Sequence, residues 1–388
     1  MELSSSFAAL NINSPHAERF FHHFVKEMPN ILTLPTEENE SLVPVMIAIA
    51  RRDKMVSKAL LCVGASHLIN NTPAAETRSV TEERLKLLQE AEKELSSRVA
   101  AMKTADPEAL LAGYLLLYLY ELSEGTGNGA WRVRLDGARS IIFNMLGGYK
   151  EPSREDLEGL GINQSLVQFF IYHDTLASVT IQQPSRKILI SKKPSSNQSE
   201  HVFGVNNGLL IFIARVSALQ SEARAAGAIS SPIIAQAFSI WKDIDKWRPP
   251  AYGSDDEESF DYRNMCEAYV AAIFIWLFFI VYPDNLADDK VQVMVRKGLE
   301  SLDAIDELWL MSFGLFPAFL IAVACVQAQD RELLKDQLDR IEEARRFRNV
   351  QVCRNLIRSS WACYDAGERK SWDWICLMKA QGLSMSVT

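Results

Sequence analysis

The chain has few of the cysteines that stabilise small secreted proteins or bind structural metals. Its 388 residues include six cysteines, and no two of them stand in the C-x2-C spacing of a zinc site. Cys62, Cys266 and Cys325 lie in apolar segments with helical periodicity. This pattern predicts reduced, buried thiols in a nuclear or cytoplasmic protein, without a disulfide framework and without a metal site.

Long apolar segments are also scarce. Residues 1–13 contain neither the basic region nor the long apolar region of a signal peptide, and we expect them to be a flexible N-terminus. The longest apolar run covers residues 268–282, between Glu267 and Pro283. Fifteen residues are fewer than the roughly 20 that a helix needs to cross a bilayer, so the run predicts a buried core helix and no membrane span.

Positive charge is in deficit. Lys and Arg number 41 against 49 Asp and Glu, which gives a formal net charge of -8. Phosphate neutralisation by basic groups supplies most of the energy of nucleic-acid binding, so DNA-binding domains are normally basic. The composition therefore predicts no direct, specific binding to DNA.

Catalytic sequence motifs are missing too. The chain contains no G-x-S-x-G, no P-loop and no H-E-x-x-H. The acidic stretch 255–258 follows Pro249 and Pro250 in a predicted loop, and it lacks the third spaced aspartate of a magnesium-binding cyclase motif. No strand precedes the glycine-rich stretch 125–129, which is therefore predicted to be a turn. We expect no metal and no cofactor.

What the chain has in abundance is apolar residues at helical spacing. Hydrophobic residues make up 48% and charged residues 23% of a composition typical of a globular protein. The sequence predicts an all-α fold, a large irregular bundle of roughly twelve or more helices in a single domain of residues 14–388. The predicted helices cover residues 14–28, 42–69, 81–102, 106–121, 130–145, 164–180, 207–225, 232–247, 260–282, 290–310, 316–327, 331–361 with a break near Phe347, and 371–380. Residues 183–203 and 248–259 are predicted loops.

Polar residues inside these apolar helices are the candidates for a site. His173 and Asp174 interrupt the run FFIYHDTL, and a buried carboxylate is costly unless it is paired. Asp174 either accepts a salt bridge from an arginine or serves as a polar anchor in a ligand cavity. His67 is expected to be a hydrogen-bonded core histidine, and the adjacent His22 and His23 point to different sides of one helix.

A second group of candidates begins at Trp131. Trp131, Leu135 and Ala138 share one predicted face, while Arg132 and Arg139 share another and could meet Glu121 or Asp174. A structural polar network and a binding role both remain open. The binding hypothesis is a mainly apolar cavity that is also lined by aromatic side chains such as Tyr172 or Trp309. The candidate ligand-binding residues are Tyr118, Glu121, Trp131, Arg132, Asp136, Arg139, His173, Asp174 and Trp276.

Short motifs in one order along the chain carry a family resemblance. They are Phe20-x-x-His23-Phe24, the stretch 59–68, residues 115–121 followed by Trp131-x-x-x-Leu135-x-Gly137-Ala138, Phe169-Phe170-x-x-His173-Asp174, Phe203-Gly204, Phe316-Pro317-x-Phe319, Arg331, Trp361 and Trp372-Asp373-Trp374. Together they resemble the fungal-specific transcription factor domain, the helical regulatory region that follows the zinc cluster in many fungal regulators. The zinc cluster, which is the DNA-binding module of those regulators, needs six closely spaced cysteines, and no stretch before Phe20 supplies them. The resemblance implies a helical fold and a regulatory ancestry, and it transfers no catalytic residue.

Two functions fit this resemblance. The first is a regulatory protein without its own DNA-binding module, which binds an apolar small molecule or a partner regulator in fungal secondary metabolism. The alternative is a metal-free cyclase or pericyclase, such as a Diels-Alderase, acting on a terpenoid or polyketide intermediate in the same cavity. A pure scaffolding protein is a third possibility, and a homodimer is possible in each case.

Overall fold

The structure of the chain is a computed structural model. It describes residues 10, 15–33, 42–72, 78–101, 106–147, 156, 157, 159–181, 201, 202, 205–249 and 256–388. The predicted loop 183–203 and the short segment 187–190 within it lie almost wholly outside these residues, as do Phe203-Gly204 and Asp255.

The described residues confirm the all-α fold. They form sixteen helices and one antiparallel pair of two-residue strands, β1 (His201–Val202) and β2 (Val205–Asn206), in which His201 faces Asn206. The chain divides into two compact units. Unit 1 consists of Met1–Phe170 and Arg346–Asn349, and unit 2 of Ile171–Arg345 and Val350–Thr388. The division falls within helix α9 (Gln164–Ala177).

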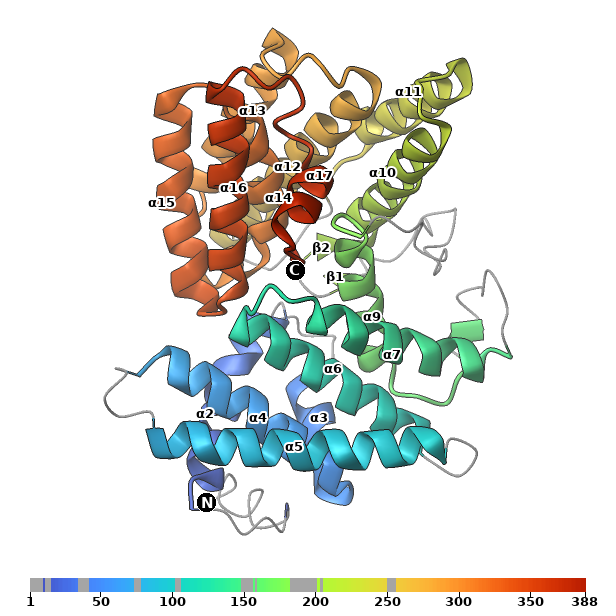
Figure 1. Cartoon of the computed structure of the whole chain (residues 1–388), viewed down its shortest axis with the longest axis vertical. Helices are drawn as coiled ribbons and strands as arrows, with labels where there is room; N and C mark the ends of the chain where they lie inside the picture. Colours follow the sequence, from blue (N-terminus) through green and yellow to red (C-terminus); the bar gives the residue numbers. More distant parts are fainter. Residues whose placement is uncertain are drawn as a thin grey trace. The chain divides into compact units, whose positions relative to one another are not determined.

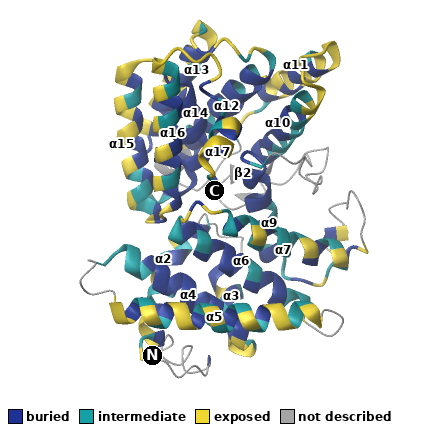
Figure 2. Cartoon of the chain, viewed as in Figure 1, coloured by how far each residue is buried: buried dark blue, intermediate teal, exposed yellow. Residues whose placement is uncertain are grey.

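Unit 1 is a helical bundle with α4 at its centre (Figure 1). Helix α4 packs against α2, α3, α5 and α6, and its residues from Met55 to His67 are nearly all buried (Figure 2). An apolar helix buried on every side is expected at the core of a bundle. The helices of unit 1 are α2 (Ala17–Leu32), α3 (Leu42–Arg52), α4 (Lys54–Asn70), α5 (Arg78–Ala100), α6 (Pro107–Glu124) and α7 (Ala130–Met145).

Unit 2 is built around α12, which packs against α10, α11, α13 and α14. All but the last residue of the apolar run 268–282 lies in this helix, and Ala268, Ile275 and Trp276 are fully buried. Helix Phe260–Val281 is long and apolar enough to cross a membrane by composition, but 67% of its most apolar window is buried inside the structure. The helices of unit 2 are α10 (Asn207–Ala226), α11 (Ser231–Lys246), α12 (Asp256–Val281), α13 (Asp289–Asp303), η2 (Leu308–Phe313), α14 (Leu315–Ala324), α15 (Ala328–Arg345), α16 (Asn349–Asp365) and α17 (Trp374–Gln381).

Local sequence signals set several helix ends as predicted. Asp106 caps α6 by accepting a hydrogen bond from the Glu108 backbone N–H at 3.0 Å, and Pro107 follows at the first helical position. Gly125 ends the same helix with φ 57°, a left-handed conformation that costs glycine little. The predicted break near Phe347 is confirmed, because α15 ends at Arg345 and Arg346 has φ 53°.

The predicted stop at Pro29 is wrong. Helix α2 continues through Pro29 to Leu32, and Met28, Ile31 and Leu32 are buried. A proline removes one helical N–H donor, but burial of the following apolar side chains outweighs that loss here.

The single helix predicted over residues 42–69 is two helices, α3 and α4, because the Asp53 side chain caps α4 by accepting hydrogen bonds from the backbone N–H groups of Met55 and Val56.

Two further predicted limits also need correction. Helix α13 ends at Asp303, well before residue 310, and residues 308–313 form a separate 3-10 helix. The Asp261 carboxylate accepts hydrogen bonds from the backbone N–H groups of Asp306 and Glu307 at 3.0 and 2.8 Å, which stabilises the turn between the two helices. Helix α12 begins at Asp256, so it takes in the end of the predicted loop 248–259.

Candidate functional site

Two of the predicted aromatic residues meet in unit 1. The rings of Tyr118 on α6 and Trp131 on α7 contact each other edge to face, with centroids 6.4 Å apart. Both side chains are buried, at 0% and 5% exposure. The indole N–H of Trp131 has no hydrogen-bond partner among the described residues, which is unusual for a buried tryptophan.

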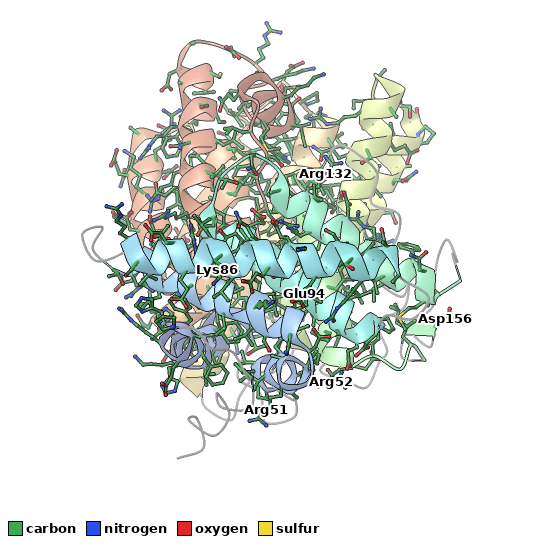
Figure 3. The ribbon with its side chains drawn as sticks, turned by 60° about the horizontal axis from the view of Figure 1, so that its bottom comes forward. Arg51, Arg52, Lys86, Glu94, Arg132 and Asp156 are labelled. Atoms are coloured by element: carbon green, nitrogen blue, oxygen red, sulfur yellow. The ribbon has the colours of Figure 1, made fainter. Side chains whose placement is uncertain are left out.

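The predicted charged residues of α7 lie together on one side of that helix. Arg132, which is labelled in Figure 3, and Arg139 each form an ion pair with Asp136, whose side chain is 49% exposed. Pairs at this spacing on an exposed helix contribute only tenths of a kcal/mol. The three residues form a local surface cluster on one helix.

Glu121 pairs with an arginine that the sequence did not single out. Arg134 lies between Glu121, at 3.3 Å, and Glu92 on α5. Burial raises the pKa of Glu121, and the charge of Arg134 opposes that rise. Glu121 therefore belongs to a structural network that ties α5, α6 and α7 together.

The most buried ion pair of unit 1 was also not predicted. Arg84 on α5 forms a hydrogen-bonded ion pair with Glu124 on α6, and their side chains are 9% and 13% exposed. Ser66 donates a hydrogen bond to the same carboxylate at 2.5 Å, and the guanidinium lies 5.6 Å from the centre of the Tyr120 ring. The i, i+4 pattern of charges in α5 looks like that of a solvated helix, so no sequence pattern indicates this pair.

His67 is a hydrogen-bonded core histidine, as predicted. Its Nδ1 lies 2.8 Å from Nε2 of His23, and its ring contacts Phe347 at 5.8 Å. Burial lowers the pKa of His23, and the nearby Glu27 carboxylate partly opposes this effect. Burial therefore favours the neutral form of His23, and the contact between the two rings joins α2 to α4.

The predicted residues His173 and Asp174 lie in unit 2, where both are buried at 5% and 4% exposure. Burial holds the pKa of His173 well below its usual value, and the positive charge of Arg345 lowers it further, by a smaller amount. The imidazole is therefore neutral at pH 7, with one nitrogen donating and one accepting.

Two buried phenols accompany this histidine. Tyr172 hydrogen-bonds to Tyr269 of α12, and the hydroxyl of Tyr269 donates to the Phe313 carbonyl at 2.8 Å. Burial raises the pKa of Tyr172 to about 12 and holds that of Tyr269 well above its usual value. We call Tyr172, His173, Tyr269 and Arg345 the α9 cluster: an uncharged histidine and two uncharged phenols beside one guanidinium.

Trp276 lies in an aromatic core of unit 2. Its ring contacts Trp374 at 6.1 Å, and Trp374 donates its indole N–H to the Val179 carbonyl at 2.9 Å. Trp276 itself has no hydrogen-bond partner for its indole N–H among the described residues. Trp309 of η2 is half-buried. The predicted site residues thus fall into two groups, one in each unit. The cavity that they were predicted to line stays a prediction.

The chemistry of these residues is that of recognition through hydrogen bonds and apolar contacts. Within the part of the chain that the structure describes, no group of three or more His, Cys, Asp or Glu side chains could hold a metal ion. The four most buried thiols, Cys62, Cys266, Cys325 and Cys353, have raised pKa values because of burial, which keeps them protonated and weakly nucleophilic.

Comparison with known proteins places the chain in a family. No curated protein and no solved structure matches it. A family model described as the fungal specific transcription factor domain matches residues 19–388, which include every helix from α3 to α17, most of unit 1 and all of unit 2. The chain therefore belongs to the family of the fungal specific transcription factor domain.

Proposed function

We propose that this protein is a nuclear regulator of a fungal secondary-metabolite pathway, and that it responds to an apolar small molecule bound in unit 2. The family match over residues 19–388 supports a regulatory role and a nuclear location. The small molecule and the pathway are our proposals.

The observation that supports a ligand is the α9 cluster. Its histidine and phenols lie on α9 and α12, where the unit 2 residues Leu176, Ala177 and Ile273 are at most 1% exposed. Ligand sites in proteins are mostly apolar and contain a few polar groups that orient the ligand. A neutral imidazole and a phenol can each donate or accept one hydrogen bond, which suits a hydroxyl or carbonyl on an apolar molecule.

The alternative explanation is a purely structural network. A buried polar group that is hydrogen-bonded contributes about 0.5–1.5 kcal/mol to stability, so removing it lowers stability. A residue that contacts a ligand can be changed with less effect on the unliganded fold.

The test is deletion of the gene, with measurement of both pathway transcripts and accumulated metabolites. We expect the transcripts to change, and we expect wild-type protein to restore them. His173→Phe and Tyr269→Phe should fail to restore them while melting within a few degrees of wild type. Tyr364→Phe, at a half-buried tyrosine of α16 outside the cluster, is the matched control and should restore them fully.

Two results would contradict the proposal. Unchanged transcripts with an accumulated intermediate would indicate an enzyme. Variants of the α9 cluster that melt far below wild type, with a parallel loss of every function, would indicate that the cluster is only structural.

A further inference from the structure

An unbroken row of aromatic rings runs over the surface of unit 2, from α11 onto α12. Successive ring centroids are 5.8 Å apart between Phe238 and Trp241, 5.8 Å between Trp241 and Phe274, 6.4 Å between Phe274 and Phe278, and 5.0 Å between Phe278 and Tyr282. We call these five residues the aromatic row.

The aromatic row is exposed. Phe238, Trp241 and Tyr282 are 51%, 43% and 46% exposed, and Phe274 and Phe278 are half-buried beneath them. Exposed positions continue along the outer face of α11 (Figure 2). Single exposed apolar residues are common on protein surfaces, but five aromatic rings in mutual contact form a continuous patch of the kind that marks binding surfaces.

Basic side chains flank this patch. Lys242 lies one helical turn after Phe238, and Lys246 one turn further, on the same face of α11. Both are exposed, and neither forms an ion pair with a residue that the structure describes. The patch therefore combines an apolar row with two available cations.

Acidic groups do not cancel this charge. Asp243 already pairs with Arg215 of α10 at 2.8 Å, which leaves Asp245 as the acidic side chain beside the two lysines. Lys242 and Lys246 thus outnumber Asp245 at this end of α11, on a chain whose formal net charge is -8. A partner with acidic groups is therefore complementary to the two lysines.

The area of the row argues against a second copy of this chain as the occupant. An aromatic side chain offers roughly 150–250 Å², so the exposed parts of Phe238, Trp241 and Tyr282 amount to roughly 300 Å². A stable interface between two proteins buries about 800 Å² on each partner. Two copies would also set the same positive face against itself. A single amphipathic helix needs less area and uses aromatic and aliphatic anchors at i, i+3, i+4 and i+7.

We propose that the aromatic row, with Lys242 and Lys246, docks an amphipathic helix of a partner protein that carries apolar side chains on one face and Asp or Glu beside them. The aromatic side chains supply the binding energy, because large rings lose little conformational entropy on binding. The two lysines select the acidic flank and set the direction of the helix. This inference deepens the regulatory function proposed above by naming a surface and a class of partner.

The experiment uses the purified full chain and two fluorescein-labelled helical peptides of about five turns, which is about 18 residues. Both have leucine and phenylalanine along one face; one has glutamate at the flanking positions and the other lysine. Fluorescence anisotropy should show micromolar binding of the glutamate peptide, weakened by added salt. The lysine peptide should bind about tenfold more weakly or not at all.

Variants locate the site. Phe238→Ser and Trp241→Ser should each weaken binding of the glutamate peptide about tenfold or more, as expected for aromatic anchors. The double variant Lys242→Glu with Lys246→Glu should reverse the preference between the two peptides. Leu333→Ser is the matched control, because Leu333 is 43% exposed on α15 and is not part of the row. Circular dichroism should show that all variants are folded, since the changed positions are exposed.

Several outcomes would overturn the proposal. The first is that the glutamate peptide fails to bind even at protein concentrations about 100 times the expected micromolar range. The second is that both peptides bind equally well. The third is that Trp241→Ser leaves binding of the glutamate peptide unchanged. A dimer in sedimentation that Trp241→Ser dissociates would make the row a self-association surface. Flotation with phosphatidylserine vesicles that depends on Trp241 would make it a membrane surface. None of these results depends on the transcript measurements, so the docking surface and the regulatory function can fail separately.

Discussion

Two polar clusters, one in each unit, differ in their chemical form. In unit 1, charged side chains pair across helices, as in Arg84 with Glu124 and Arg134 with Glu121. In unit 2, α9 and α12 bring together a neutral imidazole and two neutral phenols, Tyr172 and Tyr269.

This difference has energetic consequences. A buried ion pair gains little net stability, because desolvation offsets most of the attraction, but loss of one partner leaves a buried charge and is severe. Neutral groups are cheaper to bury and can exchange one hydrogen-bond partner for another. The ion pairs of unit 1 are therefore suited to holding one fixed arrangement of α5, α6 and α7, and the α9 cluster of unit 2 to accommodating a ligand.

The largest expected effect is loss of the Arg84–Glu124 pair. Glu124→Leu should lower the free energy of unfolding by about 3–5 kcal/mol, measured by urea denaturation, because Arg84 is left buried and unpaired. The control is Glu82→Leu, which removes the exposed one-turn pair with Arg78 and should cost less than about 0.5 kcal/mol. If the double variant Arg84→Met with Glu124→Leu recovers none of the loss, the pairing explanation is wrong.

The next effect concerns close helix packing in each unit. A methyl group on Gly64 of α4 would lie 2.3 Å from the backbone oxygen of Phe20, so Gly64→Ala should cost about 1–3 kcal/mol. On Gly298 of α13 it would lie 2.5 Å from Cδ1 of Ile321, a flexible side-chain end that can move aside. Gly298→Ala should therefore be the milder change, helped by the roughly 1 kcal/mol helix preference of alanine. Thermal melting of both variants under one condition decides the order.

A smaller effect is the response of unit 2 to acid. In the folded chain the pKa of His173 is well below the value of about 6.5 that the group has in the unfolded chain. Below about pH 6.5, the unfolded chain therefore binds a proton at His173 that the folded chain does not bind. The free energy of unfolding should fall with decreasing pH, by at most about 1.4 kcal/mol per pH unit for this group.

Urea denaturation between about pH 7.5 and pH 5 measures that slope. His173→Phe should remove part of it, whereas Tyr172→Phe, which keeps the histidine, should retain it. His23 in unit 1 contributes in the same direction, because burial lowers its pKa as well. An unchanged slope in His173→Phe would show that the imidazole is not the group responsible.

The smallest change is chemical labelling of cysteine, which should leave stability unchanged. Cys376 on α17 is exposed, whereas Cys62, the only cysteine in the sequence of unit 1, is fully buried. A thiol reagent should modify Cys376 first, the half-buried Cys363 more slowly, and Cys62 only after unfolding. Mass mapping of the labelled peptides checks this order, and early labelling of Cys62 would show that unit 1 opens readily.

Much of the helical architecture follows from local signals in the sequence. Asp106 with Pro107 begins α6, and glycine ends it at residue 125, because capping and left-handed φ depend on residues next to each other. Pro29 and the end of α13 were mispredicted for the opposite reason. Burial around Ile31 and the Asp261 carboxylate, which is 45 residues distant from Asp306, outweigh the local preference there.

The candidate site divides in the same way. Periodicity alone identified His173, Asp174 and Trp276 as polar or aromatic groups inside apolar helices, and all three are buried. The partner of each polar group depends on which helices pack together, and that is a property of the tertiary structure.

The sequence by itself therefore determined the helical class, the family and most helix ends, since these depend on spacing and neighbouring residues. Only the tertiary structure decided that Arg134 pairs with Glu121, that His23 meets His67, and that Trp241 contacts Phe274. Each of these contacts joins side chains from two helices, and the period of 3.6 residues predicts which face a residue occupies but not which helix that face meets.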